Sequence, residues 1–139
     1  MTFHPPTNSL PKIVIGEREE SRLTALATSA LLVGRAEYVA RVLLSEIERA
    51  DLMPDAELPE TVVRMNARVD FEIDDGERRE AELVFPGDAN IDAGKISVLT
   101  PIGAALIGLS PGQTMSLKGM DGRPHKLRVI SVRPPQPGA

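Results

Sequence analysis

Residues 100–113 read TPIGAALIGLSPGQ, and this segment organises the second half of the chain. Pro101 stands near its start and Gly108 closes its apolar run, a placement of proline and glycine that is typical of a short helix. The Ser-Pro-Gly triplet at 110–112 is a turn signal. We therefore predict a short helix over 101–108 that is followed by a tight turn.

On either side of this segment, apolar residues recur with a period of two. Val69, Phe71 and Ile73 alternate with acidic residues, which is the pattern of a strand with one buried face. The Asp75-Gly76 pair that follows is a hairpin-turn signal. These patterns predict an α+β fold in which an antiparallel sheet of about five strands wraps on one short helix. The predicted strands are 69–74, 80–85, 95–99, 114–118 and 125–132.

The N-terminal part of the chain has a helical period instead. Three glutamates between residues 17 and 20 crowd the start of one helix, where negative charge meets the positive end of the helix dipole. Gly34 separates this pattern from a second one, which we expect Pro54 to end. Two amphipathic helices joined by a short turn predict an antiparallel helical hairpin, a short coiled coil whose arms reach about 20 Å.

The distribution of proline divides the chain into sections. Proline-rich polar sequence at both ends predicts flexible tails over 1–11 and 134–139. Between them we expect the helical hairpin over 12–53, a proline-bounded linker over 54–60 and the β domain over 61–133.

Composition excludes several functions. The net charge is −4 with scattered basic residues, and only 3% of residues are aromatic. A basic stripe for phosphates and an aromatic platform for bases are therefore both missing, and we expect no direct sequence-specific nucleic-acid binding. The lack of cysteine excludes disulfides, zinc-thiolate sites and thiol catalysis. Since no apolar run approaches the ~20 residues of a membrane span, we expect a cytoplasmic protein with no membrane partner.

A search for catalytic chemistry finds no pattern that supports an enzyme. His4 lies in the N-terminal tail and His125 beside a hairpin turn, and neither has a nucleophile or metal-ligand pattern near it. Asp74, Asp88 and Asp92 lack EF-hand spacing and are better explained as turn residues. We therefore predict a protein with no catalytic residue, no metal site and no cofactor, and a monomer as its simplest state.

The turn of the predicted hairpin is unusually apolar. Leu31, Leu32 and Val33 occupy a place where a solvated tip is normally polar. Two interpretations are open: these side chains fold back onto the helices or the β domain, or they contact a partner.

Residues 100–113 also resemble the signature of the C-terminal domain of the transcript-cleavage (Gre) factors. In that signature a Ser-Pro leads into a small-residue helix, Ala-Leu-Leu-Gly, which a Val-Gly-Asp turn follows. The short hairpin, the connector ELP at 57–59 and the segment VRMNARV at 63–69 resemble one branch of the family, the regulators of nucleoside diphosphate kinase (Rnk). The similarity covers roughly residues 12–133.

The resemblance implies an FKBP-like β domain that docks at the rim of the secondary channel of RNA polymerase, while the hairpin points into the channel. It also aligns Leu31 and Gly34 with the two acids that hold magnesium in cleavage factors. Neither side chain binds magnesium, so we expect occupation of the channel entrance without transcript cleavage. The implied docking residues are Leu99, Thr100, Pro101 and Ile102, and the hairpin tip comprises Leu31, Leu32, Gly34, Arg35, Glu37 and Tyr38.

The leading hypothesis is thus a polymerase-binding transcription regulator that competes with Gre-type factors. The alternative is a cytosolic interaction module that binds another protein through the apolar tip. A residual third, a prolyl isomerase, would need aromatic walls, whereas Phe71 and Phe85 stand at strand positions suited to the core. The implied docking residues lie where a strand turns into the short helix. Pro101 and Gly103 are also the residues that such a strand-to-helix corner needs to turn and pack, so fold and partner binding explain them equally well.

Overall fold

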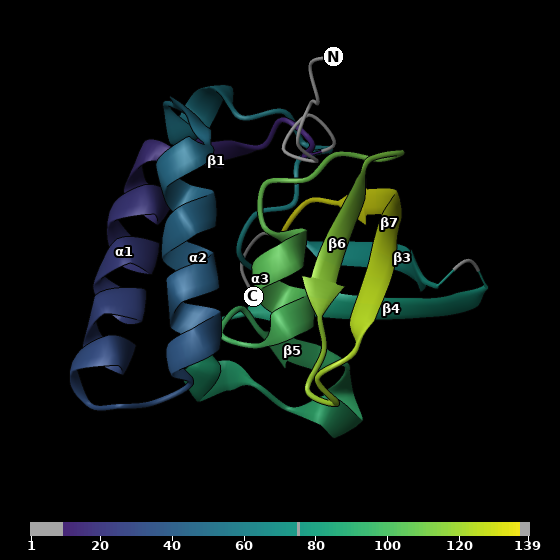
Figure 1. Cartoon of the computed structure of the whole chain (residues 1–139). Helices are drawn as coiled ribbons and strands as arrows, with labels where there is room; N and C mark the ends of the chain where they lie inside the picture. The colour runs from purple at the N-terminus through teal and green to yellow at the C-terminus, as the bar shows by residue number, and fades with distance from the viewer. Residues whose placement is uncertain (1–9, 75, 137–139) are drawn as a thin grey trace, which may run out of the picture.

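The computed structural model of the chain describes residues 10–74 and 76–136. Two antiparallel helices stand beside a five-stranded sheet, and a short third helix lies between them (Figure 1). The elements in chain order are β1 (Val14–Gly16), α1 (Glu17–Leu32), α2 (Glu37–Arg49), β2 (Asp51–Met53), the 3₁₀ turn η2 (Asp55–Glu57), β3 (Arg68–Ile73), β4 (Glu77–Val84), the 3₁₀ turns η3 (Pro86–Asp88) and η4 (Ile91–Ala93), β5 (Lys95–Ser97), α3 (Pro101–Leu106), β6 (Thr114–Lys118) and β7 (Pro124–Arg133).

Helices α1 and α2 each present a buried apolar face. Leu23 and Ala27 of α1 recur with helical spacing, and so do Leu43 and Ile47 of α2, and all four side chains are buried. Helix α1 begins at Glu17, where the crowded acidic residues predicted its start.

The second helix ends earlier than expected. We predicted that Pro54 ends it, but α2 stops at Arg49. The chain then extends as β2 and pairs in parallel with β1, with Ile15 opposite Leu52. The prediction of this helix end is wrong because the pairing joins segments on opposite sides of the hairpin, which no local pattern reveals.

The main sheet has the strand order β5-β4-β3-β7-β6. Neighbouring strands in the series β4-β3-β7-β6 are antiparallel. This confirms the predicted α+β class and the antiparallel character of that part of the sheet. Edge strand β5 departs from the pattern, because it runs parallel to β4 with Leu83 opposite Ile96. A parallel neighbour needs a crossover connection rather than a tight hairpin, and the segment that contains η3 and η4 supplies it.

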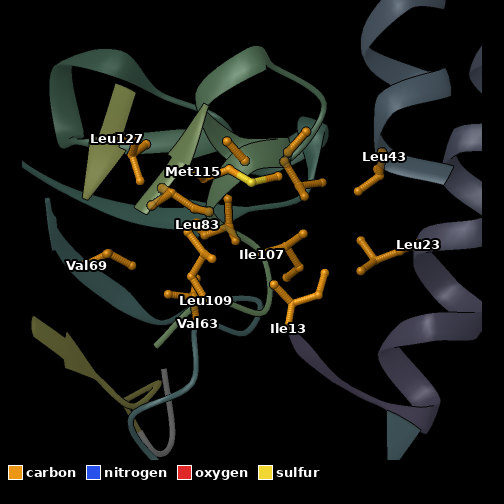
Figure 2. Close-up of a cluster of buried hydrophobic side chains, with 14 of the residues drawn as sticks. Ile13, Leu23, Leu43, Val63, Val69, Leu83, Ile107, Leu109, Met115 and Leu127 are labelled. Atoms are coloured by element: carbon orange, nitrogen blue, oxygen red, sulfur yellow. The ribbon is translucent and has the colours of Figure 1, made fainter. Parts of the chain in front are cut away.

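One hydrophobic core joins the helical hairpin to the sheet (Figure 2). Leu23 and Leu43 point from the helices toward Ile107, which directly follows α3, and Leu83 belongs to the same buried cluster on the sheet. Because this cluster contains residues from both sides of the predicted linker over 54–60, the division of the chain there stays a prediction.

A buried carboxylate fixes the hairpin against the β domain. Glu19 accepts the Met65 N–H at 3.2 Å and lies 3.7 Å from the Arg64 guanidinium. Burial raises the pKa of Glu19, although the hydrogen bond from Met65 opposes that effect. Asp55 accepts the Arg18 N–H in the first turn of α1 at 2.8 Å. These contacts set the direction in which the hairpin turn points.

The flexible tails predicted over 1–11 and 134–139 lie largely outside the described residues. The end of the first one is tied down, because the Pro11 carbonyl accepts a hydrogen bond from Arg49 at 2.6 Å. In the described part of the chain, no helix is long and apolar enough to cross a membrane.

Candidate functional site

The apolar tip of the hairpin faces solvent. Leu32 is 82% exposed and Val33 is 69% exposed, while Leu31 packs against the core. Of the two interpretations of this tip, folding back therefore holds for Leu31 alone. Leu32 and Val33 form an apolar projection at the end of α1, which is the arrangement that a partner contact requires.

The rest of the tip turns the chain into α2. Gly34 adopts a left-handed conformation with φ of 71°, and Ala36 adopts one with φ of 45°. The Arg35 N–H donates to the Ala30 carbonyl at 2.8 Å, which ties the turn to the end of α1. Glu37 opens α2 and supplies the one carboxylate between residues 31 and 38.

The strand-to-helix corner is tightly built. The Thr100 hydroxyl donates to the Ser97 carbonyl at 2.6 Å and accepts the Gly103 N–H at 3.1 Å, so it caps α3. Pro101 occupies the first helical position. A Cβ on Gly103 would lie 2.1 Å from the Ser97 carbonyl oxygen, which means that α3 can approach β5 this closely only with glycine there.

A large cleft of about 690 Å³ opens beside this corner. Thr100, Pro101 and Ile102 line it, whereas Leu99, the fourth predicted docking residue, does not. Ile91 in η4 and Met120 in the β6–β7 turn also line the cleft, and they are 92% and 89% exposed. Sequence analysis missed both, although an isolated large apolar residue in a loop rich in Asp and Gly was a signal that could have identified them.

A smaller cleft of about 260 Å³ lies between α2, α3 and β6. Tyr38 from the hairpin and Pro101 from the corner both line it, and the Lys118 ammonium lies 5.6 Å from the centre of the Tyr38 ring. Because Pro101 lines both clefts, the structure brings one residue of the predicted tip together with the predicted docking corner. Leu31, Leu32, Gly34, Arg35 and Glu37 line neither cleft.

His125 also lines the large cleft, and its ring lies between two carboxylates. Its Nδ1 lies 2.6 Å from Asp74, and its Nε2 lies 3.1 Å from Asp121. The hydrogen bonds with Asp74 and then Asp121 raise the pKa of His125. The pKa of Asp74 is lowered mainly by His125, and that of Asp121 mainly by the Arg123 N–H. Sequence analysis assigned Asp74 to a turn and gave His125 no partner.

This cluster does not have the form of a metal site. The two carboxylates contact opposite nitrogens of the ring, so an ion bound at one nitrogen would reach only one of them. Among residues 10–74 and 76–136, no group of three or more His, Asp or Glu side chains is arranged to hold a metal ion.

Comparison with known proteins identifies the class. The family model "Transcription elongation factor, GreA/GreB, C-term" matches residues 58–134. The chain therefore belongs to the Gre-factor family, as the resemblance over 12–133 predicted.

Individual members of the Gre-factor family show which of its proteins this chain is similar to. A regulator of nucleoside diphosphate kinase from Escherichia coli (strain K12) is 33% identical over 125 residues, which cover 89% of this chain and 90% of that protein. A transcription elongation factor GreA from Thermodesulfovibrio yellowstonii is 34% identical over 91 residues, which cover 65% of this chain and 57% of that protein. A solved structure of a prokaryotic transcription elongation factor GreA/GreB from Nitrosomonas europaea is 32% identical, has a TM-score of 0.68, and covers 88% of this chain and 99% of that one. These relatives are named as regulators and elongation factors rather than as classical enzymes.

Proposed function

We propose that this chain is a cytoplasmic, monomeric transcription regulator that binds RNA polymerase at the rim of its secondary channel and competes there with Gre-type factors. Family membership and the similarity to a regulator of nucleoside diphosphate kinase support a role of this class. The regulation of nucleoside diphosphate kinase would then be an indirect consequence of an effect on transcription.

The single observation that carries the proposal is that the two clefts meet at Pro101 in the predicted docking corner. Pro101 lines both clefts, Tyr38 extends the smaller one onto α2, and Leu32 projects from the tip of the same hairpin. A specific protein interface needs such a contiguous patch with apolar anchors, because a few buried side chains supply most of its binding energy. The docking residues are proposed to be Thr100, Pro101 and Ile102, with Leu99 supporting the corner from its partly buried position against the core.

The tip of the hairpin argues against a cleavage activity. Metal-assisted hydrolysis at a two-metal site needs hard oxygen ligands in defined positions. The tip carries only Glu37, and the resemblance places Leu31 and Gly34 where cleavage factors have acids. At 16 and 13 residues, α1 and α2 extend about 24 and 20 Å, so the hairpin is a short probe.

The experiment compares the binding of three variants to core RNA polymerase. We expect Leu32→Asp and Met120→Asp each to weaken binding about tenfold or more, since each places a charge in the apolar surface. Leu52→Asp is the matched control: Leu52 is 48% exposed on β2, which lies with β1 at the end of the helical pair remote from the hairpin turn (Figure 1).

Thermal unfolding of each variant shows whether the fold is intact. All three substitutions are at exposed positions, so the free energy of unfolding should change by less than about 0.5 kcal/mol. Equal weakening by all three variants, or none by Leu32→Asp and Met120→Asp, would contradict the proposed surface. A folded chain that does not bind polymerase at micromolar concentration would leave the alternative, an interaction module with another partner.

A further inference from the structure

The two carboxylates beside His125 impose a protonation state on its ring. Asp74 lies 2.6 Å from Nδ1 and Asp121 lies 3.1 Å from Nε2, and ionised carboxylates only accept hydrogen bonds. Both ring nitrogens must therefore carry a proton, which makes the ring an imidazolium. A neutral imidazole has a single N–H, so one of the two contacts must be lost when the ring is deprotonated.

The cluster connects two turns that are distant in sequence. Asp74 directly follows β3 and also accepts the Lys126 N–H at 3.0 Å, so its position is fixed by the sheet. Asp121 lies in the β6–β7 turn, where it accepts the Arg123 N–H at 2.9 Å. His125 is thus a clasp between the end of β3 and the β6–β7 turn, and its longer contact, the one to Asp121, is the weaker of the two.

The turn that the clasp holds contributes a wall of the large cleft. Met120 precedes Asp121, is 89% exposed and lines the cleft together with His125. Gly119 packs so closely on the ring that a Cβ there would lie 2.9 Å from the His125 Cδ2 atom. Release of Asp121 from the ring would leave the turn to its own backbone hydrogen bonds, such as the one from the Gly119 N–H to the Arg123 carbonyl at 2.9 Å, and would loosen the position of Met120.

Besides His125 and Asp121, three charged side chains among the described residues line the large cleft. They are Arg79 and Glu80 on β4 and Lys95 on β5. Arg79 is paired with Glu77 at 2.6 Å, and Glu80 is paired with an arginine of β7. Among the described residues, the hydrogen bonds of the His125 ring go instead to Asp74 and Asp121.

We propose that His125 is a positioning residue whose proton closes the β6–β7 turn against β3, so that the large cleft binds its protein partner more tightly when the ring is protonated. The clasp stands on the geometry alone, and its effect on docking rests on the proposed polymerase binding. The sign follows from the contacts. Both carboxylates favour the charged ring and raise its pKa, so the closed turn is favoured fully below the ordinary histidine value of 6.5 and its extra stability is lost as pH rises through the raised pKa.

The first part of the test measures the clasp without polymerase. Nuclear magnetic resonance follows the His125 ring and the Met120 methyl group from pH 5.5 to 9, and His4→Gln leaves a single histidine to assign. We expect a His125 midpoint above 6.5 and a Met120 shift with the same midpoint. Asp121→Asn should lower the midpoint, and His125→Gln should remove the Met120 titration. A His125 midpoint at or below 6.5, or a Met120 shift that does not follow it, would overturn the clasp.

The second part measures the affinity of the full chain for core polymerase at pH 6.5 and 8.5. Exposed charge contacts have modest effects, so we expect wild-type binding to weaken about two- to fivefold at the higher pH. In the His125→Gln variant the ionisable groups of the polymerase are unchanged and only the clasp is missing. Its binding should therefore lack this additional weakening at the higher pH. Equal pH dependence in both proteins would overturn the effect on docking. An absence of polymerase binding at both pH values, with the titration of the clasp intact, would instead refute the proposed function and leave the clasp in place.

Discussion

Replacement of Gly103 by alanine has two effects of opposite sign on stability at the proposed docking corner. Alanine is favoured over glycine in a helix by about 1 kcal/mol, so helix propensity alone predicts that Gly103→Ala stabilises the protein. The structure predicts the reverse. The added Cβ would lie 2.1 Å from the Ser97 carbonyl oxygen and 2.8 Å from the Val98 Cα atom, and both are backbone atoms that cannot rotate away.

The magnitude follows from the distance that must be recovered. Ordinary contacts between such atoms begin near 3.5 Å, so the Cβ of α3 has to move by about 1.4 Å from the Ser97 carbonyl oxygen. Overpacking of this kind costs about 1–3 kcal/mol, and the displaced helix would also weaken the Thr100 cap, which contributes about 1 kcal/mol. After the gain in helix propensity is subtracted, we expect the free energy of unfolding to fall by about 2 kcal/mol, which lowers Tm by roughly 5–10 °C.

The assay is urea unfolding followed by far-ultraviolet circular dichroism. Gly87→Ala is the matched control, because a Cβ there would meet no atom within 4 Å, and it should change the free energy of unfolding by less than about 0.5 kcal/mol. If Gly103→Ala were as stable as the wild type or more so, the close approach of α3 to β5 would be refuted, and with it the account of how Pro101 and Ile102 are positioned.

Four further substitutions test other parts of the structure by the same urea assay. Leu43→Ala removes a fully buried side chain that packs toward the β domain and should cost about 2–5 kcal/mol of stability. Leu32→Ala at the exposed tip should cost less than about 0.5 kcal/mol. Similar costs for the two would contradict the assigned burial. Ala36→Gly should stabilise the protein by about 0.5–1 kcal/mol because it relieves a left-handed conformation, and a loss of stability would show that the turn is built differently. Burial raises the pKa of Glu19 above its ordinary value of 4.5, so the stability that this group contributes is full below 4.5 and is lost as pH rises through the raised pKa. Glu19→Gln should lack that loss above pH 4.5, and an unchanged pH profile would remove Glu19 as its cause.

Local patterns were sufficient for the elements whose signals lie within one segment. The helical spacing and the acidic residues at the start of α1 predicted the hairpin, and the predicted strand over 114–118 coincides with β6. The proline and glycine of residues 100–113 predicted α3, although the helix stops at Leu106 because Ile107 and the residues after it turn into the core.

The features that sequence analysis missed depend on pairing between distant segments. The parallel pairing of β1 with β2 and that of β4 with β5 have no local signature, since each strand of three residues gains its order from a neighbour elsewhere in the chain. The clasp has the same origin: Asp74 and His125 are 51 residues apart and meet only because β3 pairs with β7.

The candidate site was predictable to a similar degree. The docking corner at 99–102 was predicted from a resemblance to a known signature. Residues 100–102 line the large cleft and Leu99 does not, and the docking role of the corner stays a prediction. The depth of that cleft, and the contributions of Ile91 and Met120 to it, arise from loops that fold over the sheet and could not be deduced from the segment itself.

The most direct test of the proposed function is the binding of the purified chain to core RNA polymerase, with and without a competing Gre-type cleavage factor. Transcript cleavage is monitored in the same samples. We predict saturable binding that the cleavage factor displaces, and no stimulation of cleavage by this chain. Simultaneous binding of both proteins, or cleavage stimulated by this chain alone, would contradict the proposal of a non-cleaving occupant of the secondary channel.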